Sequence, residues 1–189
     1  MRNLTRNAVG ALLLVVWSGV EASANLIVNG GFETGDLTGW TCNETDGFCY
    51  AAKGDASPHS GTYYGYGFDN EGTGSLTQIF TTVTGVDYSV AFWISKNVNT
   101  SGQVFSYSLA GATPIALSPT NGTWTQINDS FTAAAATTEI AFFFNTAVGL
   151  GSLLLDDVSV TSVPEPATLV LFGLGLAGLG AMRRKKLAA

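Results

Sequence analysis

The residues best suited to catalysis are a single histidine and two adjacent carboxylates. His59 is the only histidine and lies in Ser57-Pro58-His59-Ser60-Gly61, a sequence typical of a turn. Asp156 and Asp157 are neighbours in a predicted strand, so alternation would place their side chains on opposite faces. A glycosidase instead needs two carboxylates that converge. No nucleophile elbow, zinc-type cluster or phosphate loop accompanies them, so the sequence favours a non-catalytic protein, with a hydrolase as the least favoured alternative.

Four residues could form a sugar-binding surface. Such surfaces combine aromatic rings, which stack on the apolar face of a sugar, with polar side chains that hydrogen-bond its hydroxyls. Trp93 and Phe143 each alternate with a neighbouring phenylalanine, and they could line a concave sheet together with Tyr63 and Gln126. The alternative is that both faces of these strands are covered. An exposed Trp93 with polar neighbours would favour sugar binding, and a buried Trp93 would argue against it.

Cys42 and Cys49 are the only cysteines and flank residues 43–48. In an exported protein such a close pair predicts a disulfide. A loop of about eight residues closed in this way contributes on the order of 2.5 kcal/mol in the chain-entropy model. A redox or metal role would need more ligands than lie nearby, so we interpret the pair as structural.

The charge of residues 25–162 is strongly acidic. Lys53 and Lys96 are the only basic side chains there, whereas twelve residues are Asp or Glu. Such a surface repels phosphate backbones, which argues against binding to nucleic acid. The carboxylates suit solubility and calcium binding outside the cell.

Short β-strands must position these residues. The region lacks helical periodicity, and runs rich in Thr, Val, Tyr and Phe recur between Gly, Asn, Asp and Pro turns. Alternating apolar residues occur in 88–95, 105–109 and 140–144, and further candidate strands are 26–29, 48–53, 63–68, 76–81, 123–131 and 153–161. We interpret 133–136 as a link. The pattern predicts an all-β fold, an antiparallel β-sandwich or jelly roll.

The N-terminal segment has the features of a signal peptide. Arg2 and Arg6 precede an apolar run, and Ala22-Ser23-Ala24 supplies the small residues that signal peptidase requires. We predict that residues 1–24 are removed by a cut between Ala24 and Asn25, the alternative being a retained N-terminal anchor.

The C-terminal segment has the features of a short membrane anchor. Residues 167–182 carry no charge. As a helix they would extend about 24 Å, somewhat short of a hydrocarbon core of about 30 Å. The basic tail 183–186 would compensate by snorkelling to the cytoplasmic headgroups; it consists of Arg183, Arg184, Lys185 and Lys186.

Pro164-Glu165-Pro166, the apolar span and the basic tail resemble, in that order, the PEP-CTERM sorting signal of Gram-negative bacteria. The resemblance covers residues 163–189 and implies that an integral-membrane exosortase processes the protein at the tripeptide. It also implies export, with membrane anchoring before processing and a final place at the cell surface or in the extracellular matrix. The alternative is an ordinary tail anchor.

Residues 25–162 carry a second resemblance. Asn29-Gly30-Gly31-Phe32-Glu33 followed by Gly39-Trp40, and the closing Leu155-Asp156-Asp157-Val158, are similar to the first and last strands of galactose-binding-like jelly rolls. That family includes carbohydrate-binding modules and purely structural domains. Its first and last strands often share a structural calcium ion, which implies Glu33 and Asp156 as ligands, with Asn29 or a loop carbonyl completing the shell. The alternative is that Glu33 bonds its own turn and the aspartates face solvent.

These observations predict a signal peptide, a β-sandwich ectodomain and a sorting signal. We expect an exported, non-catalytic surface or matrix protein, whose partners are signal peptidase, an exosortase and the membrane. A carbohydrate-binding module for extracellular polysaccharide is the alternative function of the ectodomain.

Overall fold

The computed structural model describes residues 23–54, 56–97, 103–145, 151–164 and 175. Ser23–Val163 forms one compact unit, and its fold is considered by itself. The predicted signal peptide before Ser23 and the sorting signal beyond Pro164, apart from Gly175, lie outside the described residues. No helix in the described part of the chain has the length and apolar character needed to cross a membrane.

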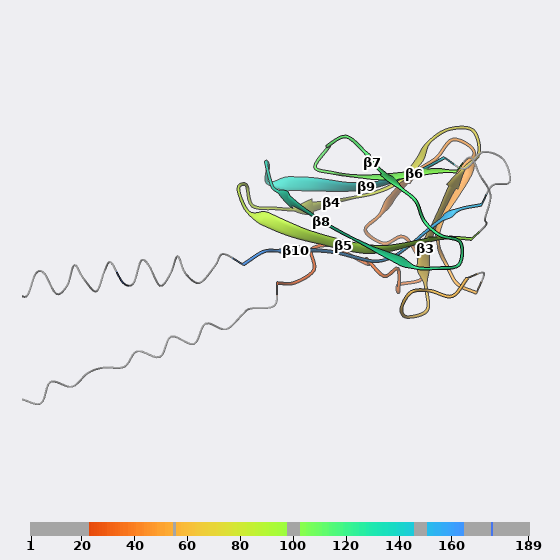
Figure 1. Cartoon of the computed structure of the whole chain (residues 1–189), viewed down its shortest axis with the longest axis horizontal. Helices are drawn as coiled ribbons and strands as arrows, with labels where there is room; N and C mark the ends of the chain where they lie inside the picture. The colour runs from red at the N-terminus through yellow and green to blue at the C-terminus, as the bar shows by residue number, and fades with distance from the viewer. Residues whose placement is uncertain (1–22, 55, 98–102, 146–150, 165–174, 176–189) are drawn as a thin grey trace, which may run out of the picture. The chain divides into compact units, whose positions relative to one another are not determined.

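Two five-stranded antiparallel sheets form the unit (Figure 1). The first sheet has, in spatial order, β1 (Thr41–Asn43), β4 (Gly74–Thr81), β9 (Thr137–Asn145), β6 (Val104–Leu109) and β7 (Ile115–Leu117). The second sheet has β2 (Gly47–Ala52), β3 (Tyr64–Asp69), β10 (Leu153–Ser162), β5 (Asp87–Lys96) and β8 (Thr125–Thr132). The predicted all-β antiparallel sandwich is therefore confirmed.

The core lies between the sheets and follows from alternation along each strand. Phe92 of β5 meets Phe142 of β9 edge to face, with ring centroids 4.9 Å apart. Tyr107 of β6 packs on the same Phe92 ring at 5.0 Å. Trp93 and Phe143, which directly follow Phe92 and Phe142 in their strands, are only half-buried, because they face outward from their sheets.

The predicted strand at residues 26–29 does not form. Leu26 N–H donates to the Val160 carbonyl, but the next bonds go to side chains: Ile27 N–H binds Asn25 and Val28 N–H binds Gln78. Asn29 then adopts a φ of 51°, which ends the extended backbone. The segment runs beside β10 without joining its ladder.

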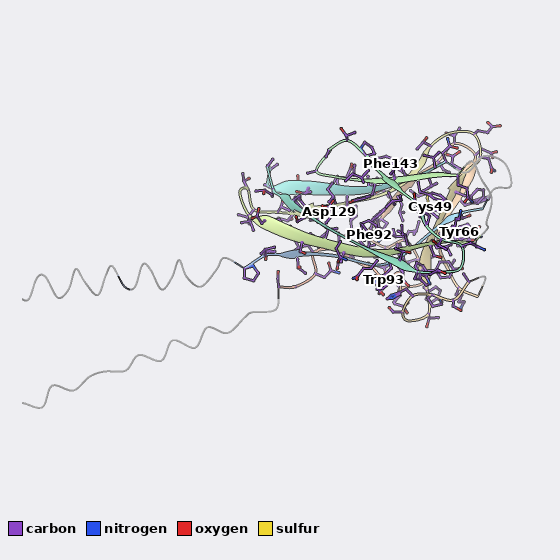
Figure 2. All side chains as sticks on the ribbon, viewed as in Figure 1. Cys49, Tyr66, Phe92, Trp93, Asp129 and Phe143 are labelled. Atoms are coloured by element: carbon purple, nitrogen blue, oxygen red, sulfur yellow. A yellow bond between two sulfur atoms is a disulfide. The ribbon has the colours of Figure 1, made fainter. Side chains whose placement is uncertain are left out.

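The predicted disulfide joins Cys42 to Cys49, with the Cα atoms 5.9 Å apart. Cys42 lies in β1 and Cys49 in β2, so the bond links the edge of the first sheet to the edge of the second. Figure 2 places Cys49 between the layers. It thus joins the two sheets along one edge of the sandwich, where both cysteines pack against the hydrophobic core.

Candidate functional site

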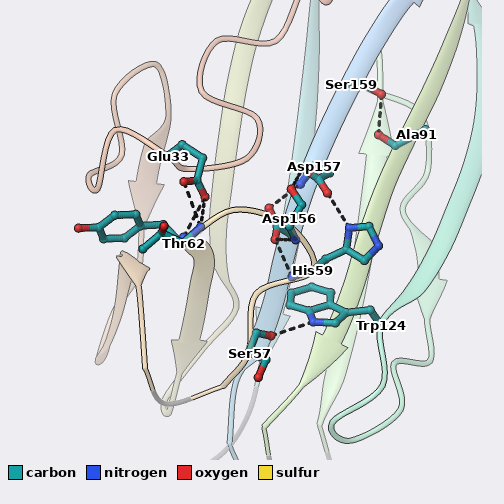
Figure 3. A network of polar contacts seen from close by, with 11 residues as sticks. Glu33, Ser57, His59, Thr62, Ala91, Trp124, Asp156, Asp157 and Ser159 are labelled. Atoms are coloured by element: carbon teal, nitrogen blue, oxygen red, sulfur yellow. Dashed lines mark hydrogen bonds and ion pairs between the residues drawn. The ribbon is translucent and has the colours of Figure 1, made fainter.

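Carboxylates from the first and the last part of the domain sequence hold a loop at residues 57–63 (Figure 3). Glu33 accepts hydrogen bonds from the backbone N–H groups of Thr62 and Tyr63, at 2.8 and 2.9 Å from its Oε1. Gly61, with a φ of 63°, allows this approach: a Cβ there would lie 2.3 Å from the same oxygen. The sequence motif around Glu33 therefore serves to grip a loop that lies 29 residues further along the chain.

Asp156 holds the same loop from β10. Its Oδ2 accepts from His59 N–H at 2.9 Å and from Ser60 N–H at 3.2 Å, while Oδ1 accepts from Asp157 N–H at 2.8 Å. The residue is 0% exposed. Burial raises the pKa of Asp156 from 3.8 to about 6, against the lowering effect of these backbone hydrogen bonds.

The expectation that Asp156 and Asp157 point to opposite faces is wrong. The pairing of β10 with β5 is irregular between Asp156 and Ser159, and Asp157 adopts a φ of 49°. A bulge of this kind interrupts strand alternation. As a result Asp157 also turns toward the loop, where its two oxygens bind His59 Nδ1 at 2.6 Å and Ser60 Oγ at 2.8 Å.

His59 lies flat on Trp93. Their ring centroids are 3.8 Å apart with an interplanar angle of 16°, and the Trp124 ring meets His59 edge to face at 6.1 Å. One face of Trp93 is therefore covered by protein. Trp93 is thus half-buried, neither the exposed ring that would favour sugar binding nor the buried ring that would argue against it.

The convergence of two aspartates and a histidine raises the question of catalysis. Asp156 is fully buried and its oxygens already accept three backbone hydrogen bonds, so it cannot contact a substrate. Asp157 is bound to the loop through both oxygens. The cluster therefore has the character of a structural clamp.

The same cluster can be tested as a calcium site. A Cβ on Gly31 would lie 3.4 Å from Asp157 Oδ1, 3.7 Å from Asp156 Oδ1 and 3.8 Å from Glu33 Cγ, so three carboxylate side chains surround a position without a side chain. Among the described residues, no three acidic, histidine or cysteine side chains are already arranged to hold a metal. The oxygen donors nevertheless suit a hard cation whose shell is completed by carbonyls and water.

Asn29 has a different task from the expected one. Its amide nitrogen donates to the Asp36 carbonyl at 3.0 Å, and its oxygen accepts from Thr34 N–H at 3.2 Å. These bonds close the turn that follows.

The four candidate sugar-binding residues do not form one surface. Trp93 and Gln126 are register partners on the second sheet, and Tyr63 directly precedes β3 of that sheet, where its hydroxyl is 3.2 Å from Lys53 Nζ. Phe143 is on the first sheet and faces the other way (Figure 2). A single groove lined by all four is therefore not formed.

Phe143 lies at the centre of a polar row across the first sheet. Strand register places Ser75 on one side of it and Ser106 on the other, with Asn43 beyond Ser75 and Ala116 beyond Ser106. The adjoining row consists only of small residues, Thr41, Thr77, Ala141 and Ser108. We call the two rows together the Phe143 strip; it presents one aromatic ring among hydroxyl groups.

Two family models match the chain. The model of the carbohydrate binding domain matches residues 24–151, and the model of the PEP-CTERM protein-sorting motif matches residues 162–185. No curated protein gives a significant sequence match.

Solved structures of the same fold include carbohydrate-binding modules. TmCBM61, solved with β-1,4-galactotriose, has a TM-score of 0.56 and 21% identity, over 75% of this chain and 100% of that chain. The CBM22-1 xylan-binding domain of Paenibacillus barcinonensis Xyn10C has a TM-score of 0.58 and 10% identity, over 78% and 100%. Tailspike protein 4 of bacteriophage CBA120 has a TM-score of 0.55 and 16% identity, over 74% of this chain but only 21% of the tailspike chain.

At these identities the structural likeness shows the fold alone, and the family models carry the assignment. The carbohydrate binding domain model spans residues 24–151, which is more than half of the 189 residues. The chain therefore belongs to the carbohydrate binding domain family, and it carries a PEP-CTERM protein-sorting motif behind that domain.

Proposed function

We propose that this protein is a non-catalytic polysaccharide-binding protein of the cell surface or extracellular matrix. Signal peptidase would remove the leader, and an exosortase would process the membrane-anchored chain at Pro164-Glu165-Pro166. Family membership supports sugar binding, and the sorting motif supports export. The burial of Asp156 supports a domain that binds without catalysis.

The observation that carries the sugar-binding proposal is the register of the Phe143 strip. Pyranose rings have an apolar face that stacks on an aromatic ring, and their hydroxyls need partners at the ring edge. Ser75 and Ser106 stand directly beside Phe143 on its two neighbouring strands. The adjoining row carries only small side chains, and Phe143 itself is half-buried.

The preferred ligand is a β-1,4-linked chain. TmCBM61 was solved with β-1,4-galactotriose, and the CBM22-1 domain is described as xylan-binding. An uncharged chain also avoids repulsion by the acidic surface of residues 25–162.

Phe143→Ala is expected to weaken binding of β-1,4-galactotriose or xylohexaose by about tenfold, because the mutation removes the stacking ring. Affinities of the full chain would be measured by isothermal titration calorimetry. Val83→Ala, which shortens a 63%-exposed apolar side chain in a loop, serves as the control and should leave the affinity unchanged. Equal affinities of wild type and Phe143→Ala would contradict the site. Absence of binding by a folded wild type to every chain tested would favour display alone.

We also propose that the Glu33, Asp156 and Asp157 cluster binds a structural calcium ion. The side chains of all three residues lie around Gly31, and a divalent cation would offset the repulsion between their carboxylates.

Calcium at about 100 times its dissociation constant is expected to stabilise the fold by about 2.7 kcal/mol relative to chelator. Thermal unfolding would be followed in both conditions. Asp156→Asn should lose the response, whereas Glu139→Gln, an exposed acid of the first sheet, should keep it. Identical unfolding curves of the wild type with calcium and with chelator would rule out the ion.

A further inference from the structure

A pocket of about 340 Å³ opens on the outer side of the second sheet, away from the Phe143 strip. Its walls come from β5 at Ser95, β10 at Leu154, the segment at Ser57, and the chain between β7 and β8 at Asn121 and Trp124. Its volume falls within the range of about 300–1,000 Å³ typical of small-molecule sites. The pocket is thus a second place where this domain could hold a ligand.

Trp124 forms a rigid aromatic wall of the pocket. Its indole N–H donates to the Ser57 carbonyl at 2.9 Å, which fixes the ring (Figure 3). Tyr64 and His59 meet it edge to face, at 6.3 and 6.1 Å. Within the described residues no aromatic ring stacks on Trp124, in contrast to Trp93, whose face His59 covers. Trp124 is therefore the better stacking platform of the two.

Several neutral polar side chains also line the pocket. Asn97 is fixed at both ends of its amide, donating to the Tyr66 hydroxyl at 3.2 Å and accepting from Ser152 N–H at 2.8 Å. The side chains of Ser57 and Asn121 are exposed and make no hydrogen bond within the described part of the chain. The described lining includes one lysine and no carboxylate. A fixed indole beside exposed hydroxyl and amide groups suits a pyranose.

An aromatic surface continues from the pocket across β3 and β2. Tyr66, the partner of Asn97, packs on Tyr50 with centroids 4.8 Å apart, and Phe68 packs on Phe48 at 5.2 Å. Phe48 is 63% exposed and Tyr50 is 40% exposed. Their rings would offer stacking surface to further sugar units, so the geometry suits a chain longer than one residue.

We propose that the Trp124 pocket is a second carbohydrate-binding site, which takes a pyranose unit of a polysaccharide whose chain continues over Tyr66 and Tyr50. The proposal stands on the pocket alone. If the Phe143 strip binds sugar as well, the two sites would allow one domain to bridge two polysaccharide chains. This consequence rests on the proposed function.

The test is calorimetric titration of the full chain with β-1,4-galactotriose and with xylohexaose. We expect a stoichiometry of two for the wild type. Trp124→Ala should weaken one site by about tenfold or more and leave the other intact, and Trp124→Phe should restore part of the loss. Asn121→Ala, in an exposed loop, should weaken the same site several-fold without lowering the unfolding temperature, which covers the case in which Trp124→Ala fails to fold.

The outcomes separate this proposal from the Phe143 site. If binding is lost in Trp124→Ala but kept in Phe143→Ala, the pocket is confirmed and the Phe143 site is wrong. If Trp124→Ala and Asn121→Ala, both folded, bind with wild-type stoichiometry and affinity, the pocket proposal is overturned. It is also overturned if the wild type binds one chain only and Phe143→Ala abolishes that binding.

Discussion

Asp156→Ala is expected to lower the free energy of unfolding by about 3 kcal/mol in the presence of chelator. The mutation leaves the backbone N–H groups of His59, Ser60 and Asp157 without their acceptor. Each buried donor left unpaired costs about 1–3 kcal/mol, and relief of the buried carboxylate charge offsets part of this loss. Urea denaturation would measure the change.

Asp36→Ala is the matched control for this substitution. Asp36 also accepts a backbone hydrogen bond, from Thr38 N–H at 2.9 Å, and a side-chain bond from Thr34 Oγ at 2.6 Å. It is exposed, so water can replace the carboxylate, and the loss should be much smaller. Equal losses in the two variants would show that burial of Asp156 adds nothing to the strength of the clamp.

The pH dependence of stability gives the clamp a second signature. The pKa of Asp156 is raised by burial to about 6 in the folded state, above its ordinary value of 3.8. Between these values the folded state binds a proton that the unfolded state lacks, so stability falls as the pH rises from about 4 to 6, by up to about 3 kcal/mol.

Asp157 and His59 are ionisable neighbours of Asp156, so the difference between the wild-type and Asp156→Ala profiles isolates the contribution of Asp156. The variant should lack the fall between pH 4 and 6. A bound calcium ion would favour the ionised carboxylate and reverse the sign, so the same profile measured with calcium tests the ion independently.

The part of the fold that the sequence predicted correctly is the part with alternating strands. The eight longer strands were anticipated, because their apolar residues alternate and turn residues bound them. The strands β1 and β7, of three residues each, are too short to show a period. The segment 26–29 was wrongly predicted because its apolar residues contact the core while side chains of Asn25 and Gln78 satisfy its backbone.

The site was predictable in its residues but not in their contacts. Glu33 and Asp156 were identified from motif positions. Their common partner, the loop at 57–63, is distant in sequence from both residues, so sequence patterns did not reveal it. The bulge beside Asp157 breaks the alternation on which the prediction for the two aspartates depended. The place of Trp124 in a pocket wall was missed, because residues far apart in the sequence form this pocket, from Ala56 to Leu154.

Replacing Pro164, Glu165 and Pro166 together by alanine is expected to leave essentially all of the protein at its precursor mass in the membrane fraction. Proline disfavours helix in the residue before it, so the sequence favours an extended tripeptide, the form in which peptides add to a binding partner. Glu165 is the acidic residue of the matched sorting motif. Three alanines would instead allow an apolar helix to continue upstream.

Fractionation and immunoblotting with an antibody against the domain would measure this outcome. Thr168→Ala, just past the tripeptide, is the control and should be processed and released as in the wild type, since it keeps both the tripeptide and an uncharged span. Glu165→Gln separates the parts of the motif, because it keeps the extended backbone and removes only the charge. Normal processing of the triple variant would mean that the tripeptide is not needed for processing and merely ends a linker.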